Sequence, residues 1–284
     1  MATTLSPAFT TLFEAEVHQA YQGTAMLRNT CRMRNGVEGS SVKFPKLAAG
    51  VASERTPSTP VIPLNATFSS VEATMTDFVA SEYSDVFNQA KINFDERQEL
   101  AQLIGSAIGR REDQIILNAL SAATAGTTVA NTVVTTGSAS ASDLNVGKII
   151  AAAKALNAAN VPSSDRHLVI HANSLASLLG DERAVSADYA QLQALNAGQI
   201  NTFMGFEVHM MGTRAEGGVP IDGSSDRTCY AFHKSAIGCG VGIAPKIEVN
   251  YVPQMTSFLV TGMLSMGAIS VDANGQVDIT CRES

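Results

Sequence analysis

The sequence predicts an α+β fold that carries an extended β ribbon, and three patterns in chain order support this prediction. A Pro- and Thr-rich segment from Ser40 to about Asp77 has strand patterns at both ends. One unusually long helical pattern follows, and then a compact α/β region that ends in strands. A two-stranded ribbon with a long irregular tip is not stable alone. We therefore expect the ribbon to lie on another surface, with a second copy of the chain as the first candidate.

The N-terminal segment predicts a helix over about Pro7–Met26. Its aromatic and apolar residues lie four apart, as on one helical face: Phe9, Phe13, Val17 and Tyr21. Gly36 and Gly39 break the pattern further along the chain. We interpret this segment as a docked amphipathic arm.

The ribbon pattern begins with Val42 and Phe44, which alternate with a charged residue in a short strand that Pro45 is expected to end. The following stretch contains three prolines and therefore predicts an irregular tip: Pro57, Pro60 and Pro63. Apolar residues then alternate with polar ones in a returning strand from Val71 to Met75. Charged residues along the ribbon are our candidates for contacts between subunits: Lys43, Lys46, Glu54, Arg55 and Glu72.

The long helix is predicted to begin at Asp95 and to end near Ala122. Asp95 followed by Gln98 resembles a capping box, in which the two side chains satisfy free amides of the first turn. Apolar residues recur at helical spacing: Leu100, Leu103, Ile104, Ala107, Ile108, Ile115 and Ile116. The helix would be about 40 Å long, and Gly105 and Gly109 indicate that another element packs closely against it.

The second half of the chain predicts an α/β region and terminal strands. A helix is expected over Val146–Leu156, and a second helix, capped by Asn173, carries Leu175, Leu178 and Leu179. The predicted strands are His167–Ala172, Phe206–Met210, Cys229–Phe232, Ile247–Tyr251, Phe258–Met263, Ala268–Asp272 and Val277–Cys281. The dipeptide Asn274-Gly275 predicts a hairpin between the last two.

Composition limits the classes of function. Charged residues make up 16% of the 284 residues, below the usual quarter, which fits a protein that hides much of its surface in subunit contacts. The formal net charge of -7 argues against general electrostatic attraction to nucleic acid. The first residues have neither a basic nor a long apolar region, so we expect no signal peptide, no membrane span and synthesis in the cytoplasm.

No pattern predicts a catalytic, cofactor or metal site. The cysteines are too widely spaced for a zinc knuckle, and we expect reduced thiols: Cys31, Cys229, Cys239 and Cys281. His167 and His171 have an HxxxH spacing, but they lie on a predicted strand, where four residues separate them by about 13 Å. We expect His209 to be a strand surface residue. The glycines of GCGVGIAP do not fit a dinucleotide site, and Asp181, Glu182 and Asp188 lack an acid or base partner.

Taken in order, these segments resemble the major capsid protein of tailed bacteriophages, the family with the HK97-type fold. The resemblance covers nearly the whole chain. Four stretches carry it: the arm and ribbon QGTAMLRNTCRMRN, SVKFPKL and ERTPSTPVIP; the long helix NFDERQELAQLIGSAIGRREDQIILNAL; the segment LNAANVPSSDRHLVIHANSLASLLGD; and the strand GFEVHMM.

The resemblance implies an HK97-like division into an N-terminal arm over 1–38, an extended loop over 39–82, a peripheral domain with the spine helix over 83–141 and 246–284, and an axial domain over 142–245. It implies a shell subunit that is no enzyme, forms hexamers and pentamers of an icosahedral head in the virion and is assembled in the host cytoplasm. The implied partners are further copies of the chain, a portal, a separate scaffolding protein, a decoration protein and packaged double-stranded DNA bound without sequence specificity. No coiled-coil propeptide is visible in the sequence.

Two alternatives stay open at this point. An encapsulin-like nanocompartment shell would share the fold and enclose a cargo enzyme, and the helical pattern of Pro7–Met26 is compatible with it. An α/β enzyme with an unrecognised site is the alternative from another class.

Overall fold

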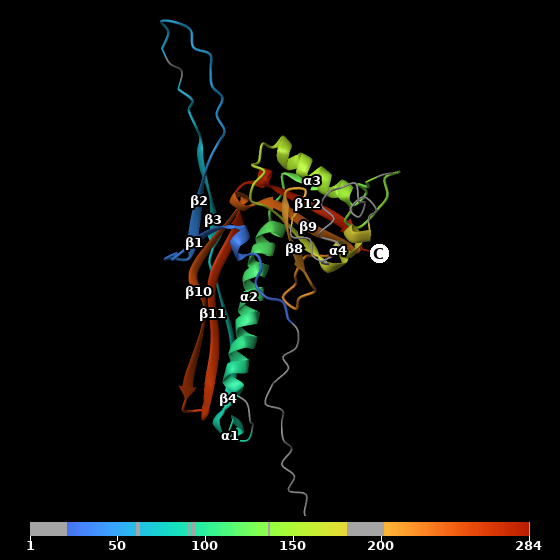
Figure 1. The fold of residues 1–284 in the computed structure, drawn as a ribbon. Coiled ribbons are helices and arrows are strands. Elements are labelled where there is room, and N and C mark those ends of the chain that lie inside the picture. The colour runs from blue at the N-terminus through green and yellow to red at the C-terminus, as the bar shows by residue number, and fades with distance from the viewer. Residues whose placement is uncertain are drawn as a thin grey trace, which may run out of the picture.

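The computed structural model describes residues 22–60, 63–89, 91, 95–135, 137–180 and 202–283. Figure 1 shows a long sheet with one helix running along it, a second sheet beside the end of that helix, and a ribbon that projects away from both. The predicted arm helix lies outside the described residues up to residue 21, and residues 22–26 are not helical. The acidic residues Asp181, Glu182 and Asp188 also lie outside them.

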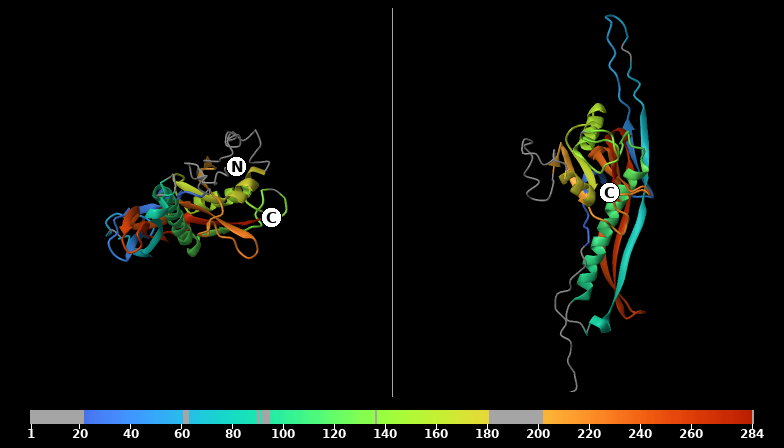
Figure 2. Two further views of the ribbon diagram at one scale, coloured as in Figure 1. Left: turned by 90° about the horizontal axis from the view of Figure 1, so that it is seen from below. Right: turned by 90° about the vertical axis from the view of Figure 1, so that its right-hand side faces the viewer.

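The long sheet has four strands in the order β1-β10-β11-β4. They are β1 (Arg32–Asn35), β10 (Ile237–Val252), β11 (Ser257–Ser270) and β4 (Thr76–Asp85). β10 and β4 run antiparallel to β11, whereas β1 pairs in parallel with the first part of β10. Helix α2 (Glu96–Ala122) covers one face of this sheet, and the short α1 (Val86–Gln89) follows β4 (Figure 2).

The second sheet has six strands in the order β5-β12-β9-β6-β8-β7. They are β5 (Thr127–Val129), β12 (Gln276–Arg282), β9 (Asp226–His233), β6 (Arg166–His171), β8 (Phe206–Met211) and β7 (Thr202–Phe203). Helix α3 (Val146–Ala158) packs on one face, and α4 (Ala172–Gly180) follows β6. Three short 3₁₀ turns complete the described elements: η1 (Arg28–Thr30), η2 (Lys234–Ala236) and η3 (Ala273–Gly275).

The long helix begins where the sequence predicts. The Asp95 carboxylate caps it by accepting the Arg97 amide at 3.1 Å, and Glu96 and Glu99 place negative charge in the first turn, where the helix dipole favours it. The cap residue is therefore confirmed, although its bond goes to Arg97 and not to the Gln98 amide of a capping box.

Close packing fixes α2 on the sheet. Ile104 and Ile108 are buried over Gly262 of β11, where an added Cβ would lie 2.5 Å from Ile104 and 3.0 Å from Ile108. Val260 belongs to the same core, whereas Ile269 of β11 packs against the base of the ribbon. The absence of a side chain at Gly262 lets the helix approach the strand.

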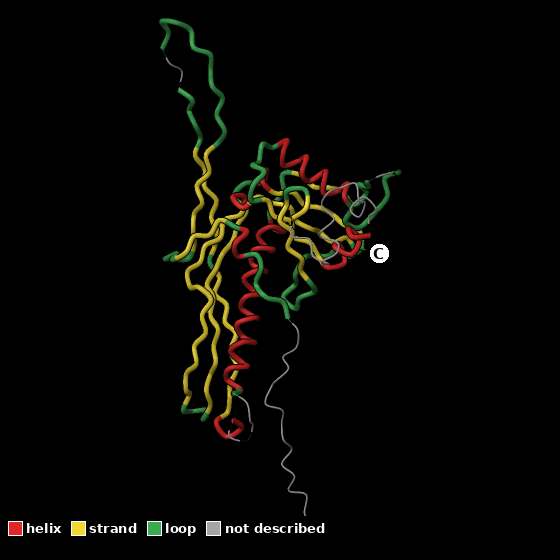
Figure 3. The backbone as a smooth tube through the Cα atoms, in the orientation of Figure 1, coloured by secondary structure: helices red, strands yellow, loops and turns green. Residues whose placement is uncertain are grey.

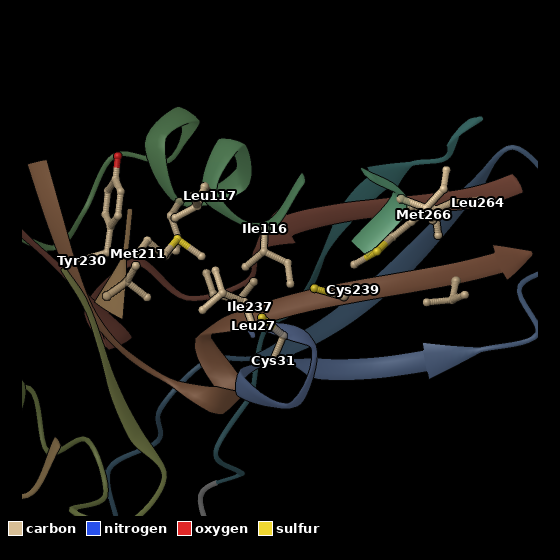
Figure 4. Close-up of a cluster of buried hydrophobic side chains, with 14 of the residues drawn as sticks. Leu27, Cys31, Ile116, Leu117, Met211, Tyr230, Ile237, Cys239, Leu264 and Met266 are labelled. Atoms are coloured by element: carbon tan, nitrogen blue, oxygen red, sulfur yellow. The ribbon is translucent and has the colours of Figure 1, made fainter. Parts of the chain in front are cut away.

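The C-terminal half of α2 joins the two sheets. Ile116 and Leu117 point into a cluster that includes Ile237 and Cys239 of β10 and Tyr230 of β9 (Figure 4). Leu27 and Cys31 enter the same cluster from the N-terminal segment. One core therefore holds the arm, the long helix and both sheets together.

A buried carboxylate in α2 fastens the arm to the helix. Asp113 is fully buried and accepts the amides of Met26 and Leu27 at 3.0 and 2.9 Å. Arg214, in the loop after β8, donates to the other carboxylate oxygen at 2.7 Å and to the Thr24 carbonyl at 3.0 Å. This one acid thus orders three segments that are distant in sequence.

A second set of polar contacts lies beside it. Arg110 donates to Glu216 at 2.9 Å and to the Gln22 side chain at 2.6 Å. Burial raises the pKa of Glu112, and Arg28, at 3.5 Å, opposes this rise. The arm is therefore held to α2 through its backbone, through the Gln22 side chain and through the Arg28–Glu112 ion pair.

Several predicted elements differ from the structure. β2 (Ser41–Leu47) continues through Pro45, because this strand pairs only with β3 (Phe68–Thr74) and an edge strand tolerates a residue without an amide proton. Helix α4 begins at Ala172, so Asn173 lies inside the helix and is not its cap. The Asn173 amide donates to the His171 ring at 3.2 Å. The two strands predicted over 258–272 form the single strand β11.

The predicted Asn274-Gly275 hairpin is wrong. The dipeptide lies in η3, a turn that leads from β11 in the long sheet to β12 in the second sheet. β12 pairs with β9 and β5, so the last strand of the predicted peripheral domain lies in the sheet of the predicted axial domain. The domain boundaries themselves stay predictions.

We predict that Ile108→Ala lowers the free energy of unfolding by about 2–5 kcal/mol, because it removes a buried side chain and leaves a cavity. Gln102→Ala, on the exposed side of the same helix, is the control and should change stability by less than about 0.5 kcal/mol. Urea unfolding of the unassembled subunits measures both. Equal small effects would show that α2 is not packed on β11 as described.

Candidate assembly surface

The ribbon is the most exposed part of the described chain. β2 and β3 pair from Ser41 opposite Thr74 to Leu47 opposite Phe68, and the Ala48 amide closes the ladder on the Thr67 carbonyl at 3.0 Å. All described residues from 47 to 70 are exposed. Figure 3 shows the irregular tip beyond the paired strands. The predicted ribbon and its tip are confirmed as structure.

The exposed part of the ribbon carries large apolar side chains. Leu47 is 54% exposed, Val51 85%, Leu64 59% and Phe68 77%. Such side chains on a projecting ribbon have no apolar surface of their own to cover them. An exposed cluster of this kind is typical of a contact with another protein.

The base of the ribbon is fixed by a platform of glycines. Val42 and Phe44 are buried over the start of β10, where an added Cβ at Gly240 would lie 2.5 Å from Val42 and one at Gly238 would lie 2.9 Å from the Phe44 ring. The glycines of GCGVGIAP thus lie in a strand. The missing side chains of Gly238 and Gly240 leave the space that Phe44 and Val42 fill. The ribbon is held at its base and free along its outer part.

Three of the five candidate contact residues have partners within the chain. Lys43 lies 3.7 Å from Glu72 on the opposite strand, and Ser41 also donates to Glu72. The Ser41 hydrogen bond and the charge of Lys43 lower the pKa of Glu72. Lys46 binds Asp272, near the end of β11, at 2.9 Å. These three residues therefore already have charged partners within the chain.

Glu54 and Arg55 lie in the exposed tip, without an ion pair to any residue that the structure describes. Contact of the five residues with a second subunit stays a prediction, and Glu54 and Arg55 are the two whose charges are available for it.

The long sheet offers a second surface. β1 pairs only with the first part of β10, so the remainder of β10 is an edge. Ile247, Val249 and Tyr251 on that part are 41–50% exposed. On the sheet face away from α2, Val79 and Tyr83 of β4 are exposed as well. Open edges and apolar faces favour association with other chains.

The cysteines lie within the protein interior. All four cysteines are free and buried. Within the described part of the chain, no helix is both long and apolar enough to span a bilayer.

Comparison with known proteins identifies the family. Residues 5–283 match the family model described as phage capsid protein. The chain belongs to this capsid family. It is therefore a structural subunit of a phage shell, located in the virion, and not an enzyme.

Solved capsids share the HK97-like fold of this capsid protein. The capsid of cyanophage P-SCSP1u superposes with a TM-score of 0.77 at 16% identity, covering 98% of this chain and 94% of that chain. The head of Helicobacter pylori bacteriophage KHP40 gives 0.78 at 10% identity, covering 99% and 98%. Mycobacterium phage Che8 gives 0.69 at 17% identity, covering 98% of each. Comparison with curated proteins gives no match.

We predict that Gly240→Ala lowers the stability of the capsid protein by about 1–3 kcal/mol, because the new methyl group overpacks the base of the ribbon. Gly223→Ala is the control, since nothing lies within 4 Å of its added Cβ. Urea unfolding and limited proteolysis of the ribbon measure the two effects. We expect faster cleavage only in Gly240→Ala. Identical unfolding and cleavage in the two variants would contradict the packing of the ribbon base on β10.

Proposed function

We propose that this chain forms the hexamers and pentamers of an icosahedral phage head that encloses double-stranded DNA. Family membership supports the capsid role, and the projecting ribbon carries the proposal for how subunits join. The outer ribbon reaches past its own body and lays Val51, Leu64 and Phe68 on the neighbouring subunit. Glu54 and Arg55 at the tip supply the polar contacts at the edge of that interface.

The anchored base gives this contact its direction. Lys46–Asp272 and the packing of Phe44 on Gly238 hold the ribbon to β10 and β11. A ribbon fixed in this way loses less conformational freedom when it binds than a free loop would. This preorganisation supports a contact that forms repeatedly with the same geometry around a capsomer.

The further partners belong to the same proposal. Assembly takes place in the host bacterial cytoplasm with a portal and a separate scaffolding protein, and a decoration protein binds the finished shell. The packaged DNA is held without sequence-specific contacts. The net charge of -7 supports weak attraction of DNA to the subunit.

We predict that deletion of residues 50–60 leaves a folded subunit that assembles poorly. These residues are exposed, so their loss should hardly change the melting temperature, whereas the contact with the neighbour loses Val51 and the charged tip residues Glu54 and Arg55. Thermal unfolding measures the first effect, and negative-stain microscopy of the purified protein measures the second.

The point variant Val51→Ser refines this test, because it keeps the length of the ribbon and removes one apolar group that is 85% exposed. Weaker assembly at unchanged stability supports the proposed contact. A deletion that unfolds the subunit, or that assembles as well as the full chain, would refute it. Shells that contain a protein cargo and no DNA would instead support the encapsulin-like alternative.

We predict that isolated subunits bind duplex DNA very weakly at moderate salt. Few phosphate contacts are expected from an acidic subunit, and each such contact would add salt-dependent affinity. Filter binding with labelled duplex measures retention across a salt series. Submicromolar binding that weakens steeply with salt would contradict this part of the proposal.

A further inference from the structure

Two histidines and a glutamate meet on the second sheet, at a place that the sequence spacing does not reveal. β6 and β8 pair in parallel, with His167 opposite Glu207 and Val169 opposite His209. Side chains two residues apart project from the same face of a strand, so all three groups share one face. It is the face away from α3, because Leu168 and Ile170 point into the core that α3 covers.

The three groups have the spacing of metal ligands. The His167 Nδ1 atom lies 3.2 Å from His209 Nε2 and 3.3 Å from a Glu207 carboxylate oxygen. The other carboxylate oxygen lies 4.0 Å from His209 Nε2. Metal–ligand bonds of about 2.0–2.1 Å in a tetrahedral site would separate the ligand atoms by about 3.3–3.4 Å. The two shorter distances already match this value.

The surroundings favour an ion that enters from solvent. The side chain of His167 is 7% exposed and that of His209 14%, whereas Glu207 is 57% exposed. The imidazoles are therefore held by the sheet, and the carboxylate forms the open side. This corrects the expectation that His209 is a surface residue of its strand.

The Nδ1 atom of His167 faces the other two groups, and its tautomer decides what the cluster can do. The Nε2 atom of His167 lies away from the cluster, is buried and has no hydrogen-bond partner among the described residues. With the proton on Nε2, the Nδ1 lone pair faces both His209 and Glu207, and three electron-pair donors converge. With the proton on Nδ1, His167 can donate it to His209 or to Glu207. The other acceptor then receives no hydrogen bond from His167.

We propose that His167, Glu207 and His209 bind one Zn²⁺ ion in the capsid subunit, with the fourth position open to water. Two imidazoles and one carboxylate are a known ligand set for zinc, whereas Ca²⁺ and Mg²⁺ prefer oxygen ligands. The ion links β6 to β8 and thereby stiffens this edge of the sheet.

The HxxxH pair on β6, His167 and His171, is not the proposed zinc site. His171 lies two strand repeats from His167, and its ring is 3.6 Å from Glu283 and 3.4 Å from the Thr213 hydroxyl. It has a carboxylate neighbour but no second imidazole in contact among the described residues. His171→Gln is therefore a matched control.

The test is zinc retention by the full chain and by Glu207→Gln, His209→Gln and His171→Gln. Each protein is equilibrated with Zn²⁺, freed of excess metal and analysed by mass spectrometry of the metal, while titration gives the affinity. One zinc per chain is expected for the parent and for His171→Gln. The two ligand variants should bind at least about tenfold more weakly, as even changes to groups behind the ligands have such effects.

Cobalt substitution identifies the ligands independently. Co²⁺ should give the visible bands of a tetrahedral nitrogen and oxygen site, without the intense thiolate band that binding at the cysteines would cause. Glu207 is exposed, so Glu207→Gln should keep the fold, which circular dichroism verifies. No zinc in the parent, equal affinity in Glu207→Gln, or a thiolate spectrum would each overturn the proposal and leave a histidine pair joined by a hydrogen bond.

Discussion

The subunit depends on the buried contact between Asp113 and Arg214. The acid comes from the long helix, the base from the loop after β8, and the backbone amides of Met26 and Leu27 complete the acid's partners. A buried ion pair is stable only when its remaining hydrogen-bonding groups are satisfied, and removing one partner typically costs about 3–5 kcal/mol. The arm, the helix and the second sheet therefore keep their relative positions together.

The ribbon follows a different rule from the body. Its base is packed as tightly as a core, with Phe44 against Gly238, while its outer part leaves Phe68 77% exposed. A shell subunit needs both properties. The packed base fixes the direction of the ribbon, and the exposed outer part is left to contact a neighbouring subunit. The open edge of β10 serves the same need on the opposite end of the long sheet.

The helical and strand periods of the sequence predicted α2, the ribbon and most of the strands, because burial of one face fixes those periods. What sequence could not show depends on distant partners. The Asn274-Gly275 turn has hairpin chemistry, yet its two strands enter different sheets. Lys148 is fully buried in α3 and binds the Ser142 and Thr280 carbonyls, and burial lowers its pKa. His209 joins His167 only through the parallel register of β6 and β8.

The parallel pairing of β1 with β10 has a consequence for synthesis of the chain. Arg32 lies opposite Gly238, and the ribbon base needs the same stretch of β10 beneath it. A ribosome makes β1 first, but the strand with which β1 pairs follows more than 200 residues later. Closing such a large loop comes late in folding. In a growing chain, the ribbon therefore has no fixed direction until the start of β10 has been made.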